Sequence, residues 1–274
     1  MSEFIELMAR PFLACLILAG IHAYLGLHVL AREVIFVDLA LAQIAAFGAS
    51  VGLLLGWGLD SFASYALALG FTLFGALLFA LCRHRKPVVP QEAIIGISYA
   101  VAAAASILVL SRAPEGGEEF KNLLVGHLLF AEWDEIRTIL LIYSLVGLVH
   151  WLVRKPLLLI STNPQKAFEQ GVSVRFWDFI FYCTFGIVVT SSTKLAGVLV
   201  VFSFLIVPAV CGVLLGRSIR QRLWVGWVCG FVTSAVGVAV SFLADLPTGA
   251  TVVCCFGATL ALCAGLRRLR AGVA

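Results

Sequence analysis

The sequence predicts an all-α, polytopic integral membrane protein with about nine transmembrane helices. Of its 274 residues, 62% are hydrophobic and 12% are charged, whereas a soluble domain carries about 25% charged residues. The mean hydropathy is +1.06. So few charges cannot cover a water-facing surface. The composition therefore excludes a soluble enzyme, a disordered chain and a nucleic-acid-binding module.

Nine apolar segments approach the length of about 20 residues that a membrane span needs. They cover roughly residues 10–30, 34–57, 61–82, 92–111, 136–153, 176–193, 195–216, 223–243 and 248–266. The connections are too short for a soluble domain, so residues 1–274 are expected to form a single transmembrane domain. Glu3 and Glu6 precede Arg10, so the first segment lacks the basic start of a secretory signal peptide. Eight spans result if the long apolar stretch does not turn near 192–194.

The distribution of charge predicts the orientation. With nine spans, fourteen of the nineteen Lys and Arg residues fall on one side, including clusters at 83–86, 217–222 and 267–270. The other side carries ten of the fifteen acidic residues. By the positive-inside rule, the C-terminus is cytoplasmic and the N-terminus is outside.

Residues 112–134 form the longest connection on the outer side. They contain Glu115, Glu118 and Glu119 and then an apolar piece, 123–130, that is too short to span. This piece is expected to form a re-entrant or interfacial helix. The acidic loop could attract a cation or a basic protein face, or it could be a solvated loop without a binding role.

Residues 154–175 form the longest connection on the cytoplasmic side. Asn163 can cap a helix, Pro164 can occupy its first turn, and Gly171 can end it. The helix between them contains Ala167 and Phe168. The pattern predicts a short helix on the cytoplasmic face, where a soluble partner could bind.

Ionisable side chains within a span are candidates for function because their burial in lipid is costly. Asp38 is the clearest of them, and Gln43 lies about 140° further round the same helix. His22 and His28, in the first span, point about 240° apart. A carboxylate and an imidazole that lie close together would suit zinc, manganese or iron(II).

A structural role is the alternative for each of these groups. Asp38 could pair with Arg32 or cap a helix, and each histidine could donate a hydrogen bond to a backbone carbonyl. Glu92 and Asp178 are expected to be helix-end charges, Asp178 in the first turn of its helix.

Other motifs are missing from the sequence. Its eight cysteines include no CxxC pair, so no zinc framework is predicted and the thiols are expected to be reduced and structural. There is no Walker-type phosphate loop, so the chain is not expected to hydrolyse ATP by that route.

Four stretches share their order and spacing with a known family. These are Arg32–Gly48, the Gly-His-Leu-Leu run at 126–129, Asn163–Asp178, and residues 195–209 taken together with 245–249. The mid-span Pro208 and the Leu246-Pro247-Thr248-Gly249 turn are the most specific. In these features the chain resembles the membrane permease of type 3 ABC transporters that import zinc, manganese or iron.

The resemblance implies a homodimeric permease pore, a cytoplasmic ATPase subunit that holds the ATP, and an extracytoplasmic metal-binding protein. The chain itself would bind no cofactor, and the divalent metal would be its transported substrate. Asp38 matches the pore-lining aspartate of the family, but Ala42 stands where the family has a histidine. Either Gln43 or His22 would then complete the metal site, or the substrate would differ from zinc and manganese. Segment 163–171 would be the coupling helix that contacts the ATPase. The location implied is the prokaryotic plasma membrane.

Two other classes of function stay open at this point. A secondary transporter would work without an ATPase, although no inverted repeat is apparent. A membrane-embedded metalloenzyme would need a ligand cluster such as HExxH, and the sequence has none.

Overall fold

The computed structural model describes residues 2–58, 61–85, 88–112 and 128–272. Within these ranges the chain is helical and contains no strand. Nine of the described helices are long and apolar enough to cross a membrane, which confirms the predicted fold class and favours nine spans over eight. Most of the outer loop, including Glu115, Glu118, Glu119 and His127, lies outside the described residues. Only its end is seen, as the short 3-10 helix η1 at Leu128–Phe130.

The helices divide between two compact units. Unit 1 consists of Met1–Leu30, Val125–Ser144 and Lys194–Ala274, and unit 2 of Ala31–Leu124 and Leu145–Thr193. The long helices α6 (Trp133–Leu152) and α9 (Val174–Ala196) contribute to both, and the last two residues of α1 (Ser2–Arg32) belong to unit 2. The single transmembrane domain over 1–274 stays a prediction.

Unit 1 is built on α1 (Ser2–Arg32), α10 (Val198–Leu215), α11 (Ile219–Ala244) and α12 (Thr248–Gly272). The last three pack against one another. Helix α1 approaches α10 so closely at Gly26 that a Cβ there would lie 2.0 Å from the carbonyl oxygen of Leu205. Small residues allow this kind of backbone approach between helices in a membrane.

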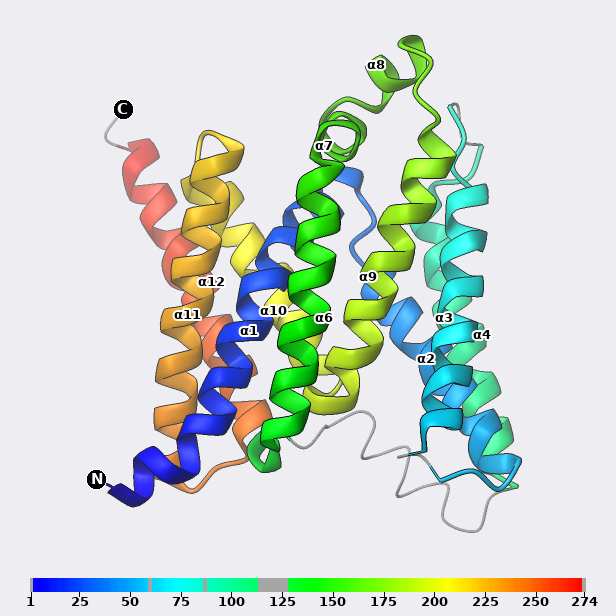
Figure 1. Cartoon of the computed structure of the whole chain (residues 1–274). Coiled ribbons are helices and arrows are strands. Elements are labelled where there is room, and N and C mark those ends of the chain that lie inside the picture. Colours follow the sequence, from blue (N-terminus) through cyan, green and yellow to red (C-terminus); the bar gives the residue numbers. More distant parts are fainter. Residues whose placement is uncertain (1, 59–60, 86–87, 113–127, 273–274) are drawn as a thin grey trace. The chain divides into compact units, whose positions relative to one another are not determined.

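Unit 2 holds α2 (Val37–Leu54) against both α3 (Phe62–Leu81) and α4 (Gln91–Leu110) (Figure 1). It also contains most of α9 and two short helices, α7 (Arg154–Thr162) and α8 (Pro164–Glu169). At Gly48 a Cβ would lie 2.8 Å from the Cα of Ala68, so glycine sets the α2–α3 approach.

The break between α9 and α10 lies further along the chain than the sequence predicts. The predicted turn at 192–194 is helical, and the helix ends at Ala196. The hydroxyl groups of Ser191, Ser192 and Thr193 donate to carbonyls four residues earlier, so these polar side chains are satisfied inside the helix. The turn falls at Gly197, whose φ of +79° suits glycine.

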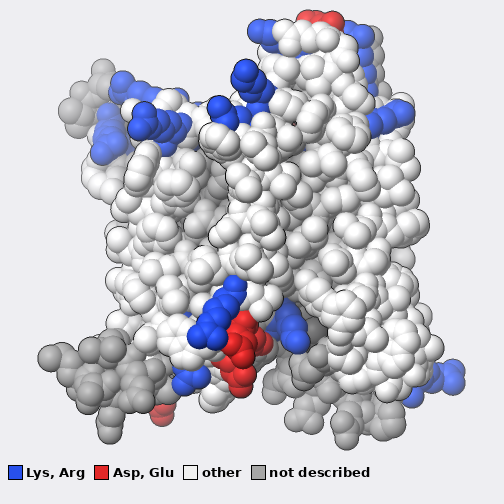
Figure 2. All heavy atoms as spheres, viewed as in Figure 1, with Lys and Arg blue, Asp and Glu red and all other residues white. Residues whose placement is uncertain are grey.

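Charged side chains gather at the helix ends. On the face drawn in Figure 2, Lys and Arg lie at the α7–α8 end of unit 2 and near the C-terminal end of α12 in unit 1. The flanks of the helices in each unit are largely uncharged in this view. This pattern is typical of helices that cross a bilayer with their charges at the water interface.

Candidate metal-binding and coupling sites

Asp38 lies at the second position of α2, in its first turn, and only 1% of its surface is exposed. The predicted span begins at residue 34, which would put Asp38 deeper in the helix. The helix instead begins at Val37. The carboxylate oxygen Oδ1 is buried and has no hydrogen-bond partner among the described residues. A buried carboxylate oxygen without a donor is costly unless a cation or a proton compensates it.

Glu92, in the first turn of α4, brings a second carboxylate to the start of α2. Its Oε1 accepts a hydrogen bond of 3.0 Å from the backbone N–H of Phe36, the N-cap residue of α2. Its Oε2 is buried and has no hydrogen-bond partner in the described part of the chain. Glu92 is thus a helix-end charge, as predicted, but its Oε1 also accepts a hydrogen bond at the start of α2. Its Oε2 is left available to a cation.

Gln43 lies on the same helix as Asp38 and is 3% exposed. Its amide oxygen Oε1 is also buried without a described hydrogen-bond partner. Ala42, one turn after Asp38, is buried as well. Unit 2 therefore holds three oxygen donors, from Asp38, Glu92 and Gln43, that the described residues leave unpaired.

His22 belongs to unit 1, in α1, and is fully buried. Its Nδ1 donates to the carbonyl oxygen of Leu18 at 2.8 Å, and its ring lies edge-on to Tyr143 with centroids 6.0 Å apart. The carbonyl contact matches the structural alternative for this residue. It also fixes the ring in the way that a metal-bound histidine is usually fixed. The role of His22 as a ligand stays a prediction.

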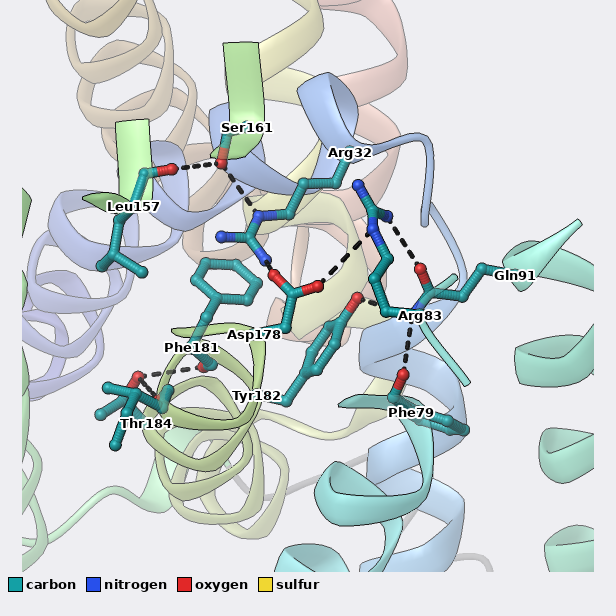
Figure 3. A network of polar contacts seen from close by, with 11 residues as sticks. Arg32, Phe79, Arg83, Gln91, Leu157, Ser161, Asp178, Phe181, Tyr182 and Thr184 are labelled. Carbon is teal, nitrogen blue, oxygen red and sulfur yellow. Dashed lines mark hydrogen bonds and ion pairs between the residues drawn. The ribbon is translucent and has the colours of Figure 1, made fainter. Parts of the chain in front are cut away.

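Arg32 does not pair with Asp38. Its guanidinium instead binds Asp178 in an ion pair whose two side chains are both fully buried (Figure 3). Its Nε donates to Ser161 Oγ at 2.9 Å, and its Cζ lies 4.0 Å from the centroid of the Phe181 ring. The end of α1 is thereby joined to α7 through Ser161 and to α9 through Asp178.

Asp178 is not in the first turn of its helix, so that prediction is wrong. Helix α9 begins at Val174 and has no acidic residue in its first turn. A second cation, Arg83, approaches the other Asp178 oxygen, with Nε to Oδ2 at 3.6 Å. The helix dipole therefore does not explain this carboxylate. The Asp178 carboxylate instead neutralises the buried Arg32. The sequence could not reveal this pair, because the two residues lie far apart along the chain.

Gln91 extends the same network toward α3 and α9 (Figure 3). Its Oε1 accepts a hydrogen bond of 2.9 Å from Arg83. Its Nε2 donates to the Phe79 carbonyl at 3.0 Å and to the Tyr182 hydroxyl at 3.1 Å. Hydrogen bonds and ion pairs of this network restrain the relative positions of the helices that contribute to it, although one Arg32 nitrogen and Asp178 Oδ2 have no hydrogen-bond partner among the described residues.

The predicted short helix in the connection 154–175 is present as α8. Asn163 Oδ1 accepts a hydrogen bond of 3.0 Å from the Lys166 backbone N–H, and Pro164 is the first residue of the helix. Gly171 follows with a φ of +69°. The preceding helix α7 was not predicted, because its apolar run at 157–160 is short and follows Arg154, Lys155 and Pro156.

This α7–α8 segment has a small hydrophobic core of its own. Ile160 of α7, Ala167 of α8 and Val174 of α9 are buried together, with Phe168 packed against them. Ala167 therefore cannot contact a partner directly. The exposed residues of α8 and its end are Gln165, Lys166, Glu169, Gln170 and Gly171.

Comparison with known proteins identifies the family. A sequence model described as the ABC 3 transport family matches residues 4–266. The chain belongs to this family. The match covers nearly the whole chain, both units included, and agrees with the resemblance seen in the four sequence stretches.

Named relatives and a solved structure agree with this assignment. The chain is 26% identical over 231 residues to a Haemophilus influenzae protein named "Probable iron transport system membrane protein", covering 78% of this chain and 82% of that protein. It is 25% identical over 201 residues to the manganese transport system membrane protein MntC of Listeria innocua, covering 69% and 70% of the two chains. PsaBC from Streptococcus pneumoniae, solved in complex with Fab, has the same fold, with a TM-score of 0.78, 17% identity and coverage of 96% and 94%.

Proposed function

We propose that this chain is the transmembrane permease subunit of an ATP-binding-cassette importer for divalent transition-metal ions. The observation that carries the proposal is the ABC 3 family match over residues 4–266. The relatives named for iron and for manganese transport support a metal of this class. The metal is the transported substrate, and ATP belongs to a separate ATPase subunit.

The donors in unit 2 favour manganese(II) or iron(II) over zinc. Asp38, Glu92 and Gln43 offer carboxylate and amide oxygens, and oxygen ligands suit manganese and iron(II) better than zinc, which prefers imidazole and thiolate. A twofold homodimer would supply each donor twice around one axis. His22 of unit 1 offers an imidazole, the kind of donor that would suit zinc.

The α7–α8 segment is the proposed contact with the ATPase. Exposed polar residues of α8, Gln165, Lys166 and Glu169, would form the contact surface. Ala167 and Phe168 would act indirectly, because they hold α8 on α7 and α9. Asn163, Pro164 and Gly171 would set where the helix begins and ends.

The proposed orientation follows from the charges. The α7–α8 segment and the C-terminus would lie in the cytoplasm and the N-terminus outside, in the plasma membrane of a prokaryote. An extracytoplasmic metal-binding protein would deliver the ion to the outer side. Residues 112–134 are on that side in this orientation.

Transport by the reconstituted complex tests the proposal. The chain is combined with its ATPase in liposomes, and ATP-dependent uptake of manganese is measured for the wild type, Asp38→Asn and the exposed control Asp134→Asn. We expect Asp38→Asn to abolish uptake because the variant removes a buried anionic donor, and Asp134→Asn to transport normally. Uptake at the wild-type rate by Asp38→Asn would show that Asp38 is structural. Uptake that needs no ATP would instead indicate a secondary transporter.

A further inference from the structure

Three cysteines of unit 1 bring their thiol groups together inside the helix bundle. Cys211 of α10, Cys229 of α11 and Cys263 of α12 place their sulfur atoms within 4.8 Å of one another. They are the one group of three or more potential metal ligands with this proximity among the described residues. All eight cysteines are free thiols, so no disulfide competes for these three.

The helices that carry these thiols are held in register close by. Thr233 and Thr259 share a hydrogen bond of 2.8 Å between α11 and α12. Thr233 follows Cys229 by one turn and Thr259 precedes Cys263 by one turn. Next to Cys211, a Cβ at Gly212 would lie 2.3 Å from the Arg222 carbonyl oxygen, so α10 and α11 are in close backbone contact there. The protein itself thus positions the three side chains, as a preorganised site requires.

The sulfur separation fits a shared metal ion better than a disulfide. Cys229 Sγ and Cys263 Sγ are 4.0 Å apart. Two thiolates bound at about 2.3 Å to one zinc ion are about 3.8 Å apart at a tetrahedral angle and about 4.0 Å apart at 120°. A disulfide would need the two sulfurs to approach to about 2.05 Å.

Burial limits the charge that such a site can carry. Cys211 is fully buried and Cys263 is 5% exposed, and a net charge in an apolar interior is costly. Binding of a divalent ion with release of two thiol protons leaves a neutral complex, in which the third sulfur coordinates as a thiol. Cys263 lies four residues before the exposed Arg267, which is about 6 Å of helix rise. The site is therefore about one turn from the water-facing end of α12.

We propose that Cys211, Cys229 and Cys263 form a binding site for one divalent thiophilic cation of the zinc and cadmium class. Soft thiolate ligands select such ions over manganese and magnesium. The site uses sulfur donors in unit 1, whereas the donors proposed for transport are oxygens in unit 2. It is thus chemically distinct from the transport site, and its existence does not depend on the proposed function.

Cadmium binding to the purified full-length chain in detergent, with reduced thiols and no ATPase, tests the site. We expect one cadmium per chain with an ultraviolet sulfur-to-cadmium charge-transfer band. Cys229→Ala and Cys263→Ala should each lose the band. Cys254→Ala, which removes an exposed thiol of α12, should keep it. A band that persists in Cys229→Ala and Cys263→Ala would overturn the proposal.

A second measurement on the wild type avoids dependence on variants that fold poorly. Maleimide labelling followed by mass spectrometry gives the reactivity of each thiol with and without zinc. Zinc should slow the labelling of Cys229 and Cys263 and leave that of Cys254 unchanged. Equal labelling of Cys229 and Cys263 with and without zinc, or their conversion to a disulfide in the presence of zinc, would contradict the assignment.

Discussion

Removal of the Asp178 carboxylate tests the importance of the buried ion pair in unit 2. Both side chains of the Arg32–Asp178 pair are 0% exposed, and Arg83 also faces the carboxylate at 3.6 Å. Loss of one partner from a buried pair costs about 3–5 kcal/mol because the other charge stays buried and uncompensated. We expect Asp178→Ala to lower the free energy of unfolding by about that amount.

The chain contains an exposed pair that serves as a matched control. Asp134 and Arg137 of α6 are joined at 3.0 Å, but their side chains are 87% and 75% exposed. Exposed pairs contribute about 0–1 kcal/mol, so Asp134→Ala should change the unfolding free energy by no more than about 1 kcal/mol. The two Asp→Ala variants remove the same group and differ chiefly in burial.

A double substitution separates the pair from its surroundings. Arg32→Met combined with Asp178→Leu removes both charges and keeps the volume apolar. It should be less destabilising than the sum of the two single substitutions, because neither Arg32 nor Asp178 is left buried without the other, and Arg83 is partly exposed to solvent. Unfolding can be followed by circular dichroism in mixed micelles titrated with dodecyl sulfate. The reasoning fails if Asp178→Ala and Asp134→Ala cost the same, or if the effects of the two single changes simply add.

Three further predictions concern transport and packing. Glu92→Gln should reduce manganese uptake at least several-fold while the chain still folds, because one anionic donor at the start of α2 is lost; uptake at the wild-type rate would remove Glu92 from the site. Lys166→Glu should lower transport per ATP hydrolysed by the complex without changing the stability of the chain, and unchanged coupling would move the ATPase contact away from α8. Gly26→Ala should destabilise the chain by about 1–3 kcal/mol because its Cβ has no room. Gly20→Ala on the same helix has open space at its Cβ and should be neutral or slightly stabilising in thermal unfolding, so equal effects of the two would refute the packing argument.

Local patterns predicted the helices well. The number of spans follows from the length of apolar runs, and the boundaries of α8 follow from Asn163, Pro164 and Gly171. The misplaced break before α10 has a local cause too. The hydroxyls of the Ser and Thr residues at 191–193 bond back to the helix, whereas the helix ends where Gly197 takes a φ of +79°, which favours glycine.

Contacts between distant helices could not be predicted in the same way. The partner of Arg32 is 146 residues away, and no spacing rule connects them. Glu92 was recognised as a helix-end charge, but its bond to the Phe36 N–H depends on the packing of α4 against α2. The three clustered thiols come from three helices, so the absence of a CxxC motif gave no information about them.

The anchoring of α7 has a mechanical consequence for the start of α2. Ser161 of α7 holds the Arg32 guanidinium, and Asp38 follows Arg32 by only six residues. The small core of Ile160, Ala167 and Val174 packs α7, α8 and the start of α9 against one another. If α8 contacts the ATPase as proposed, the path from that contact to the carboxylate of Asp38 consists of this core, the hydrogen bond between Arg32 and Ser161, and one short linker.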